Sequence, residues 1–237
     1  MANGTGTLKS IVDDLLAGRK HIRILEAGCG SMSHFKYDKD AYLVGIDISQ
    51  EQLDKNPMLN EKILGDVQNG SLPTSHFDLI ICWDVLEHLT RPELALKNFA
   101  KSANDGGLIL LASPNVLTVR GLLTKLTPHW VHVLYYRHVV GFREAGTPGN
   151  YPFRSYHRFG MSPPAIKRFA KKNGLSVEVC RYTSWDHPEN RYPLFRVVWT
   201  LINKLVNALS LGKIGTDEQK GFQIILRKQP GQGRVFR

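Results

Sequence analysis

The sequence RILEAGCGSMSHF (residues 23–35) joins a short apolar run to a carboxylate and two closely spaced glycines. The apolar run favours a buried β-strand, and Glu26 stands near its end. Gly28 and Gly30 then remove two side chains where the chain has to turn. Glycines occur in this way where backbone must adopt a left-handed conformation or where a ligand approaches it closely. The stretch therefore predicts a strand followed by a tight turn, a close ligand, or both.

Strand-like apolar runs alternate with helical segments along most of the chain. The expected strands are RILEAG (23–28), YLVGID (42–47), EKILGD (61–66), FDLIICWD (77–84), LILLASP (108–114), SVEVCRY (176–182) and GFQIILRK (221–228). Residues 90–107 predict a helix that is capped by Thr90 and ends at Gly106 and Gly107. The alternation predicts the α/β class, with a doubly wound, mostly parallel, seven-stranded sheet and helices on both faces. We expect a single domain over residues 1–237, with insertions at 115–160 and 183–217.

Acidic residues follow several of the expected strands, and the carboxyl ends of parallel strands form the edge at which ligands bind. A dinucleotide site would need the pattern G-x-G-x-x-G, but Ser33 replaces its third glycine and Glu26 would repel a pyrophosphate. Asp47 stands 17 residues after Gly30, near the spacing at which an acid binds ribose hydroxyls. The ligand should therefore carry a ribose and a positive charge but no phosphate. S-adenosylmethionine has these properties.

Five segments resemble, in order, the motifs of class I S-adenosylmethionine-dependent methyltransferases (EC 2.1.1), of the small-molecule type similar to ubiquinone-pathway O-methyltransferases. They are ILEAGCGS (24–31), VGIDIS (44–49), GDVQNGSLPTSHFDLIICWDVLEHL (65–89), GGLILLASPN (106–115) and HRFGMSPPAIKRFAKKNGLSVE (157–178). The resemblance implies that S-adenosyl-L-methionine is the cofactor. The contacts it implies are Glu26, Gly28 and Gly30 with the methionine part, Asp47 with both ribose hydroxyls, Ile48 and Asp66 with the adenine beside the Val67 amide, and the Cys82 backbone with the methionine ammonium.

Three histidines are candidate general bases, because transfer of a methyl group to oxygen requires removal of the acceptor's proton. His88 follows the fourth expected strand, and His34 and His157 are further candidates. In the O-methyltransferases that the chain resembles, the Glu-His pair belongs to an acidic cluster that can bind a divalent metal. Asp84 stands where that cluster usually has a glutamate, so we assign no metal. The alternative role for His88 and Glu87 is to cap and orient the start of a helix.

Residues 126–160 combine aromatic side chains with interleaved arginines. The aromatic residues are Trp130, Tyr135, Tyr136, Phe142, Tyr151, Phe153, Tyr156 and Phe159, and the arginines are Arg137, Arg143, Arg154 and Arg158. This mixture predicts the wall of a pocket for a flat, partly anionic small molecule, and packing over the core explains many of the aromatics as well. Stacking of single-stranded RNA is an alternative.

Residues 192–212 predict a helix with a very wide apolar face. Its polar residues form one stripe, composed of Arg196, Thr200, Asn203 and Asn207. Four roles fit this pattern: a lid over an apolar substrate, a dimer surface, a helix resting on a membrane, or burial in the core. We favour the lid, for which Phe195, Trp199 or Ile202 should line a cavity.

The composition narrows the partners and the cellular location. The chain has 31 Lys+Arg against 21 Asp+Glu, a net charge of +10, which indicates an anionic partner or simply a solvated basic surface. No consecutive block of basic residues resembles a nucleic-acid-binding arm, so we expect no nucleic-acid partner. Three scattered cysteines favour neither a disulfide framework nor a zinc site, and no stretch has the pattern of a signal peptide or membrane span. We therefore expect a cytoplasmic protein, with peripheral membrane contact through 192–212 as an option.

The function predicted from these features is methylation of a small, lipophilic or aromatic molecule, with oxygen favoured as the acceptor atom. Two alternatives remain: a methyltransferase-fold protein that binds the cofactor and regulates a partner, and a methyltransferase of a macromolecule. The Asn-Pro-Pro-Tyr type of signature found in amino-methylating relatives is absent, since residues 82–85 read CWDV.

Overall fold

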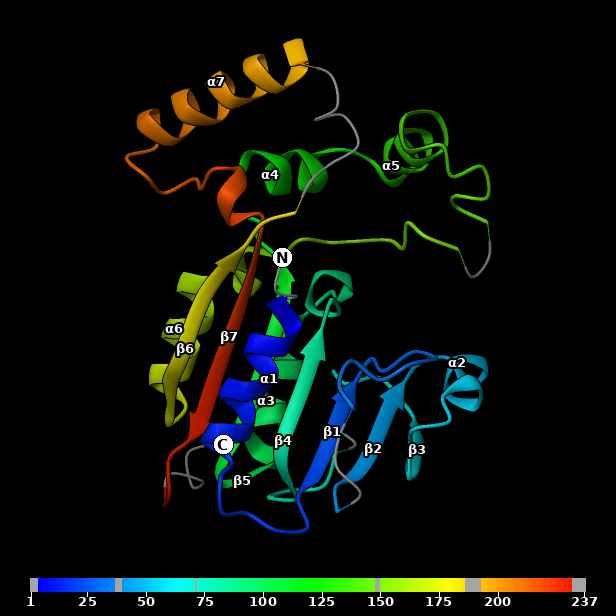
Figure 1. Ribbon diagram of the computed structural model, residues 1–237, viewed down its shortest axis with the longest axis vertical. Coiled ribbons are helices and arrows are strands. Elements are labelled where there is room, and N and C mark those ends of the chain that lie inside the picture. Colours follow the sequence, from blue (N-terminus) through cyan, green and yellow to red (C-terminus); the bar gives the residue numbers. More distant parts are fainter. Residues whose placement is uncertain (1–3, 37–39, 71, 148–149, 186–192, 232–237) are drawn as a thin grey trace.

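A computed structural model describes residues 4–36, 40–70, 72–147, 150–185 and 193–231 (Figure 1). The strands are β1 (Arg23–Ala27), β2 (Tyr42–Asp47), β3 (Glu61–Leu64), β4 (Phe77–Trp83), β5 (Ala103–Pro114), β6 (Leu175–Thr183) and β7 (Gly221–Lys228). The helices are α1 (Gly4–Leu15), α2 (Gln50–Lys55), α3 (Pro92–Ser102), α4 (Val119–Leu126), α5 (His129–Tyr135), α6 (Pro163–Lys172) and α7 (Pro193–Leu209). Short helical turns are η1 (Leu86–His88), η2 (Tyr136–Val140), η3 (Phe159–Met161) and η5 (Asp217–Gln219).

The seven strands form one sheet in the order β3-β2-β1-β4-β5-β7-β6. Pairing is parallel from β3 to β5, whereas β7 runs antiparallel between β5 and β6. Glu26 in β1 pairs with Gly45 on one side and Ile81 on the other, which brings the carboxyl ends of β1, β2 and β4 to one edge. The mostly parallel seven-stranded sheet predicted from the sequence is confirmed.

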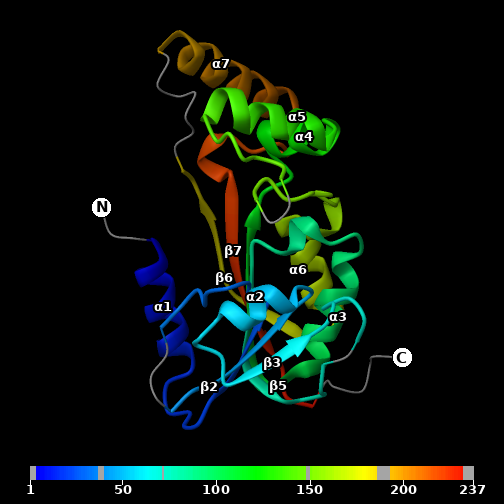
Figure 2. The same cartoon turned by 90° about the vertical axis from the view of Figure 1, so that its right-hand side faces the viewer.

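Both faces of the sheet are covered, and each cover has its own apolar core (Figure 2). On one face, Leu8 and Val12 of α1 pack against β-strand residues such as Ile24. On the other face, Phe99 of α3 and Ile166 of α6 belong to a larger cluster. Parallel strands with both faces covered are expected to be apolar throughout, and the buried stretches of β1, β4 and β5 have this composition.

A further group of helices lies beyond the carboxyl ends of the parallel strands. Figures 1 and 2 both show α4, α5 and α7 together at this end of the molecule, above β4 and β5. An isolated bridge between Thr118 and Gly215 joins the segments that carry α4 and α7. Among the described residues, no helix has the length and apolarity needed to cross a membrane.

The boundaries predicted for the helix at 90–107 were wrong at both ends. Helix α3 runs over Pro92–Ser102, and Arg91 holds the N-cap position without a side-chain bond to the helix. The Thr90 hydroxyl instead donates to Gln68 Oε1 over 3.2 Å, so a contact distant in sequence replaces the expected cap. At the other end the chain enters β5 at Ala103, which pairs with Phe77, and this pairing ends the helix before the glycines.

Candidate active site

The glycine turn after β1 is held in place by the neighbouring strands. Gly28 and Gly30 have φ angles of +67° and +54°, a region that glycine occupies without strain. The Gly28 amide donates to the Ile46 carbonyl over 2.7 Å. A Cβ added to Gly28 would lie 2.4 Å from Val85 Cγ2, so this position has no room for a side chain. The Gly30 amide donates to Asp47 Oδ2 over 2.9 Å, and an added Cβ there would meet no atom within 4 Å.

The acids after β2 and β3 shape the loops that follow them. Asp47 Oδ1 accepts from the Ser49 amide over 2.9 Å, and Asp66 Oδ1 accepts from the Gln68 amide over 2.8 Å. Each carboxylate oxygen has two lone pairs, so these bonds leave both acids able to accept from a ligand. Ile48, directly after Asp47, is 78% exposed. An exposed apolar side chain directly after Asp47 can lie against a flat heterocycle.

Burial determines the protonation state of the cysteines near the glycine turn. Glu26 is buried, and its Oε1 accepts from the His34 amide over 3.0 Å. Burial, with Asp47 and Glu26 nearby, raises the pKa of the Cys29 thiol to about 12, and burial likewise raises the pKa of Cys82. Both thiols are therefore neutral at pH 7 and are not activated nucleophiles.

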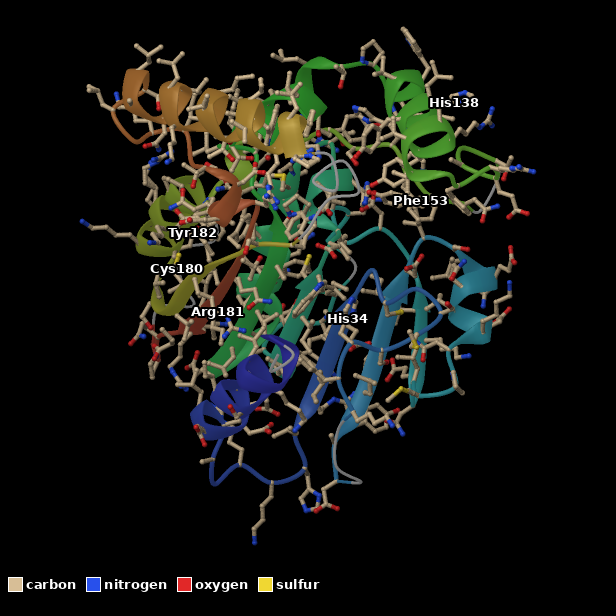
Figure 3. All side chains as sticks on the ribbon, turned by 45° about the horizontal axis from the view of Figure 1, so that its top comes forward. His34, His138, Phe153, Cys180, Arg181 and Tyr182 are labelled. Atoms are coloured by element: carbon tan, nitrogen blue, oxygen red, sulfur yellow. The ribbon has the colours of Figure 1, made fainter. Side chains whose placement is uncertain are left out.

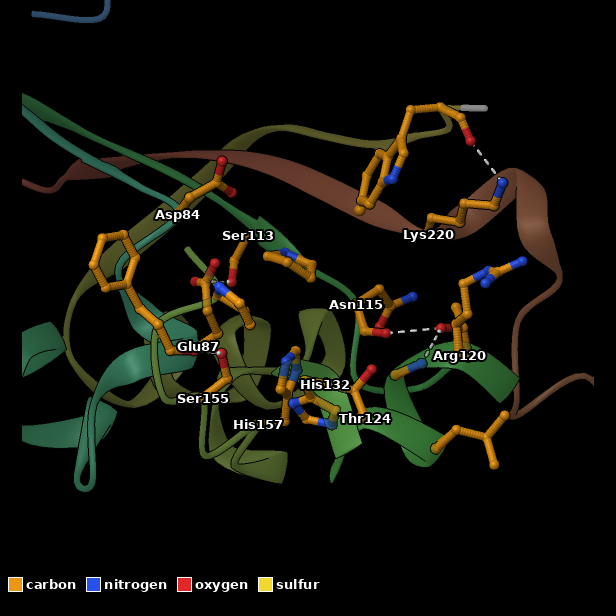
Figure 4. A pocket seen from close by; sticks show the side chains of 18 of the residues that line it. Asp84, Glu87, Ser113, Asn115, Arg120, Thr124, His132, Ser155, His157 and Lys220 are labelled. Atoms are coloured by element: carbon orange, nitrogen blue, oxygen red, sulfur yellow. Dashed lines mark hydrogen bonds between the residues drawn. The ribbon is translucent and has the colours of Figure 1, made fainter. Parts of the chain in front are cut away.

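A cavity of about 1020 Å³ opens beside the ends of β4 and β5, under α4, α5 and α7. Trp83 of β4, Ser113 of β5, Thr124 of α4, Tyr135 of α5 and Trp199 of α7 all contribute to its wall. Figure 4 shows Asp84 and Glu87 toward one end and Arg120 and Lys220 toward the other, with His132 and His157 between them. Most of the exposed surface of the wall is apolar, and many polar and charged side chains also reach it, a combination that suits small organic molecules with polar substituents.

His88 lines this cavity, and one of its ring nitrogens is hydrogen-bonded to the protein backbone. Its Nδ1 lies 2.8 Å from the Arg154 carbonyl oxygen, and because a carbonyl only accepts, Nδ1 carries the proton. In the neutral ring Nε2 therefore holds the free lone pair and is the basic atom. Burial lowers the pKa of His88 below its usual 6.5, although the Arg154 carbonyl opposes this effect. At pH 7 the ring is neutral and able to accept a proton.

Burial raises the pKa values of two acids near His88, Glu87 and Asp84. Glu87 is 4% exposed and accepts from the Ser113 hydroxyl over 2.8 Å. Burial, and then the neighbouring Asp84 carboxylate, raises the pKa of Glu87 to about 8. Burial also raises the pKa of Asp84 to about 6. The φ of Asp84 is +51°, a left-handed conformation that is rare for a non-glycine residue and often found at functional sites.

The other two candidate histidines have different surroundings. His157 lines the same cavity, and its buried Nδ1 has no hydrogen-bond partner among the described atoms. Burial, together with nearby His88, His132 and Lys125, lowers the pKa of His157 to about 4. His34 is stacked on Trp83 with ring centroids 5.4 Å apart, near the end of β4 (Figure 3). His34 does not line the cavity.

The sequence-predicted pocket wall is formed by part of the aromatic set. Tyr135, Tyr136, Tyr151 and Phe153 line the cavity, whereas Trp130 is 62% exposed. The remaining aromatic residues of that set, Phe142, Tyr156 and Phe159, are also absent from the lining. Helix α7 forms one side of the cavity through Phe195 and Trp199, as a lid requires, but Ile202 does not line it.

The cluster considered for a metal does not converge on one point. Glu87 bonds Ser113, and His88 bonds the Arg154 carbonyl. Within the described ranges, no group of three or more His, Cys, Asp or Glu side chains is arranged to hold a metal ion.

Comparison with known proteins identifies the family. A family described as "Methyltransferase domain" matches residues 3–178. The chain belongs to this methyltransferase family.

Similar proteins agree with this assignment. A "Ubiquinone biosynthesis O-methyltransferase" of Azoarcus sp. (strain BH72) is 22% identical over 207 residues, which cover 83% of this chain and 80% of the relative. The mitochondrial ubiquinone biosynthesis O-methyltransferase of Schizosaccharomyces pombe is 30% identical over 125 residues, and this match covers 47% of this chain and 45% of the relative.

Two solved structures share the fold. An S-adenosylmethionine-dependent methyltransferase from Archaeoglobus fulgidus has 17% identity and a TM-score of 0.52, with 94% of this chain and 92% of that chain covered. Another from Mesorhizobium loti has 13% identity and a TM-score of 0.56, with 92% of this chain and 96% of that chain covered.

S-adenosyl-L-methionine is the cofactor of this methyltransferase, and the residues at the ends of β1, β2 and β3 suit it. The space beside Gly30 is open, and Asp47 and Asp66 can still accept hydrogen bonds from hydroxyl and amino groups. The buried carboxylate of Glu26 favours a cation over a phosphate at the turn.

Sequence reasoning missed several residues that line the methyltransferase cavity. The one sequence feature that pointed to Ser113 was its position near the end of an expected strand. Its hydroxyl bonds to Glu87, which lies 26 positions earlier in the sequence. Lys220 was not singled out either; it lines the cavity and donates to the Trp185 carbonyl over 2.6 Å. Contacts of this kind depend on tertiary pairing and leave no local pattern in the sequence.

Proposed function

We propose that this methyltransferase transfers a methyl group to a hydroxyl oxygen of a small, lipophilic or aromatic acceptor. The observation that carries the proposal is His88, whose Nδ1 is bonded to a backbone carbonyl while the ring lines an apolar, aromatic cavity. This arrangement leaves a neutral imidazole with its basic nitrogen available at pH 7. Proton removal of this kind is needed for an oxygen acceptor.

The donor site that we propose lies at the ends of β1 to β4. Its residues are Glu26, Gly28, Gly30, Asp47, Ile48, Asp66, Val67 and Cys82, with the contacts expected from the sequence. S-adenosyl-L-methionine supplies an electrophilic methyl group on a sulfonium when it is bound. Because Gly28 packs against Val85, the glycine turn and the loop that leads to His88 are in direct contact. The donor and acceptor sites therefore adjoin.

The acid–base roles in the acceptor cavity follow from its geometry. His88 Nε2 accepts the proton that the acceptor hydroxyl loses as its oxygen bonds to the methyl carbon. Glu87, neutral at pH 7 because of its raised pKa, adds no competing negative charge that would hold a proton on His88. His157 is the second candidate base, and its low pKa of about 4 makes it the weaker one.

The acceptor class rests on the lining and on the relatives. Tyr135, Tyr136, Tyr151, Phe153 and Trp199 provide flat apolar surfaces in the cavity. The relatives named above carry out O-methylation in ubiquinone biosynthesis according to their names. The cytoplasmic location, and contact of residues 192–212 with a membrane or a second copy of the chain, stay predictions.

The test uses S-adenosyl-L-methionine labelled in its methyl group, together with an alkylated catechol, a cell lipid extract, RNA and casein as alternative acceptors. We expect label in the organic phase that withstands mild alkali, as a methyl ether does, and no label with Asp47→Ala. Label found only in RNA or casein would replace the proposal by macromolecular methylation. Donor binding by calorimetry without labelled product from any of the four acceptors would favour the regulatory alternative.

A further inference from the structure

Helix α7 turns Asn203 and Asn207 of its polar stripe toward the protein and its apolar face to the outside, while Arg196 and Thr200 of the stripe are exposed. Asn203 is 3% exposed, and its Nδ2 donates to the Trp199 carbonyl over 2.8 Å. Asn207 Nδ2 donates to the Ile214 carbonyl over 2.7 Å, and Trp199 Nε1 donates to Asp217 Oδ2 over 2.9 Å. In an ordinary surface helix the polar stripe faces water. Here Asn203 and Asn207 face the protein instead.

The outer face of α7 is a continuous apolar surface. Figure 3 shows side chains projecting from the outer side of this helix, away from the sheet. Six large aliphatic residues on this face are between 47% and 78% exposed: Leu194, Val197, Val198, Leu201, Leu205 and Leu209. Successive members recur at helical spacing, so they share one side, and an apolar surface of this kind marks an interaction site.

The neighbouring helices expose further large apolar side chains at the same end of the molecule. Leu126 of α4 is 77% exposed, and Trp130 of α5 is 62% exposed. Helices α4 and α7 are in contact, because the Arg120 guanidinium lies 4.7 Å from the centre of the Trp199 ring. A tryptophan at the edge of an aliphatic surface is typical of proteins that rest at the membrane interface.

Charge decides between a membrane and a second copy of the chain. Residues 115–143 and 193–216 contain no aspartate or glutamate. Their exposed cations are Arg137, Arg143, Arg196, Lys204 and Lys213. Arg120 instead lies against Trp199 and pairs with Asp217. Two copies that met through this surface would bring cations against cations, which disfavours association. An anionic lipid surface would be attracted by them.

We propose that α7, with the adjoining ends of α4 and α5, docks this protein on the surface of an anionic lipid bilayer. The outer face of α7 enters the acyl boundary, and Lys204 and Lys213 remain at the level of the lipid head groups. The inner sides of the same three helices wall the acceptor cavity. If the proposed function holds, a lipophilic acceptor reaches His88 from the bilayer without crossing water, but the docking itself requires no catalysis.

The test is co-sedimentation of the full chain with vesicles of phosphatidylcholine alone and of phosphatidylcholine with phosphatidylglycerol, at low and high salt. Wild type should bind the phosphatidylglycerol vesicles, and less so at high salt. Leu201→Glu/Leu205→Glu should lower the partition coefficient at least tenfold. Lys204→Gln/Lys213→Gln should lower it by roughly thirtyfold, because each cation near the surface contributes roughly fivefold.

Lys171→Gln/Lys172→Gln on α6 is the matched control. All three double variants change the net charge equally, so this control should bind as wild type does if the site is α7. Circular dichroism and cofactor affinity report whether each variant is folded, independently of methyl transfer. Equal loss in all three variants, equal binding to both vesicle types, or no binding by wild type at low salt would overturn the proposal. A wild-type dimer that Leu201→Glu/Leu205→Glu dissociates, without vesicle binding, would assign the surface to a second copy instead.

Discussion

Glu87 should make the stability of this protein depend on pH in a way that one isosteric substitution removes. Its carboxyl is 4% exposed, and burial followed by the Asp84 carboxylate raises its pKa from 4.5 to about 8. As pH rises, the unfolded chain therefore releases this proton first, whereas the folded protein retains it. Folding is favoured most by this group below pH 4.5, and the contribution is lost as pH rises through about 8.

The expected magnitude follows from the two pKa values. Their difference corresponds to roughly 5 kcal/mol at 1.36 kcal/mol for each unit of pKa. Asp84 changes stability in the same direction, but its pKa of about 6 confines most of its effect to lower pH. Between pH 6 and pH 8, the free energy of unfolding of the wild type should fall by about 2–3 kcal/mol through Glu87. Glu87→Gln keeps a hydrogen-bond acceptor for Ser113, and its free energy of unfolding should not show this decrease between pH 6 and pH 8.

The assay is urea unfolding followed by tryptophan fluorescence at pH 6, 7 and 8. The quantity compared is the difference between wild type and Glu87→Gln, in which the other ionisable groups cancel. Glu93→Gln, which removes an exposed carboxylate from α3, is the control and should follow the wild type. Parallel pH dependences for wild type and Glu87→Gln would refute a protonated, buried Glu87.

Three further predictions concern the turn, the base and the lid. Gly28→Ala should lower the free energy of unfolding by about 2–4 kcal/mol, through left-handed strain and overlap with Val85. Gly30→Ala should lower it by only about 1–2 kcal/mol, since it has open space; similar urea midpoints would contradict this reasoning. His88→Ala should lower kcat roughly 10²–10⁴-fold and abolish the acid limb of the pH–rate profile, without changing cofactor affinity by calorimetry; full turnover would return His88 to a structural role. Trp199→Ala should raise the KM of the acceptor more than that of the cofactor, because Trp199 lines the acceptor cavity; equal increases in steady-state assays would argue against a lid.

Much of the fold could be predicted from the sequence because its signals are local. The apolar run that ends in Glu26 and the glycine turn gave β1 and its loop, and similar runs gave the other strands. The position of β7 between β5 and β6 could not be predicted, because it depends on pairings such as that of Leu108 with Arg227. The cap expected at Thr90 failed for the same reason, since Gln68 takes its hydroxyl.

In the candidate site, too, the features with a local sequence signal could be predicted and those that depend on tertiary contacts could not. Asp47, Asp66 and His88 could be proposed from their places at strand ends, and His88 lines the cavity. The orientation of α7 was not found, because the polar stripe that contains Asn203 would suit either water or a polar interior. The contacts of Trp199 and Asn207 with the segment around 214–217 show which side faces inward.

The segment at 154–157 is tied to the loop that carries the base, and this tie has a mechanical consequence. Besides the Arg154 carbonyl bonded to His88, the amides of Tyr156 and His157 donate to the Glu87 carbonyl over 2.7 and 3.3 Å. The segment that carries Tyr151 and Phe153 therefore cannot swing away from the sheet without releasing the proton on His88 Nδ1 from its partner. The backbone bonds that hold this aromatic wall in place therefore also hold the Nδ1–H tautomer of the base, so the shape of the cavity and the basic atom of His88 depend on the same few contacts.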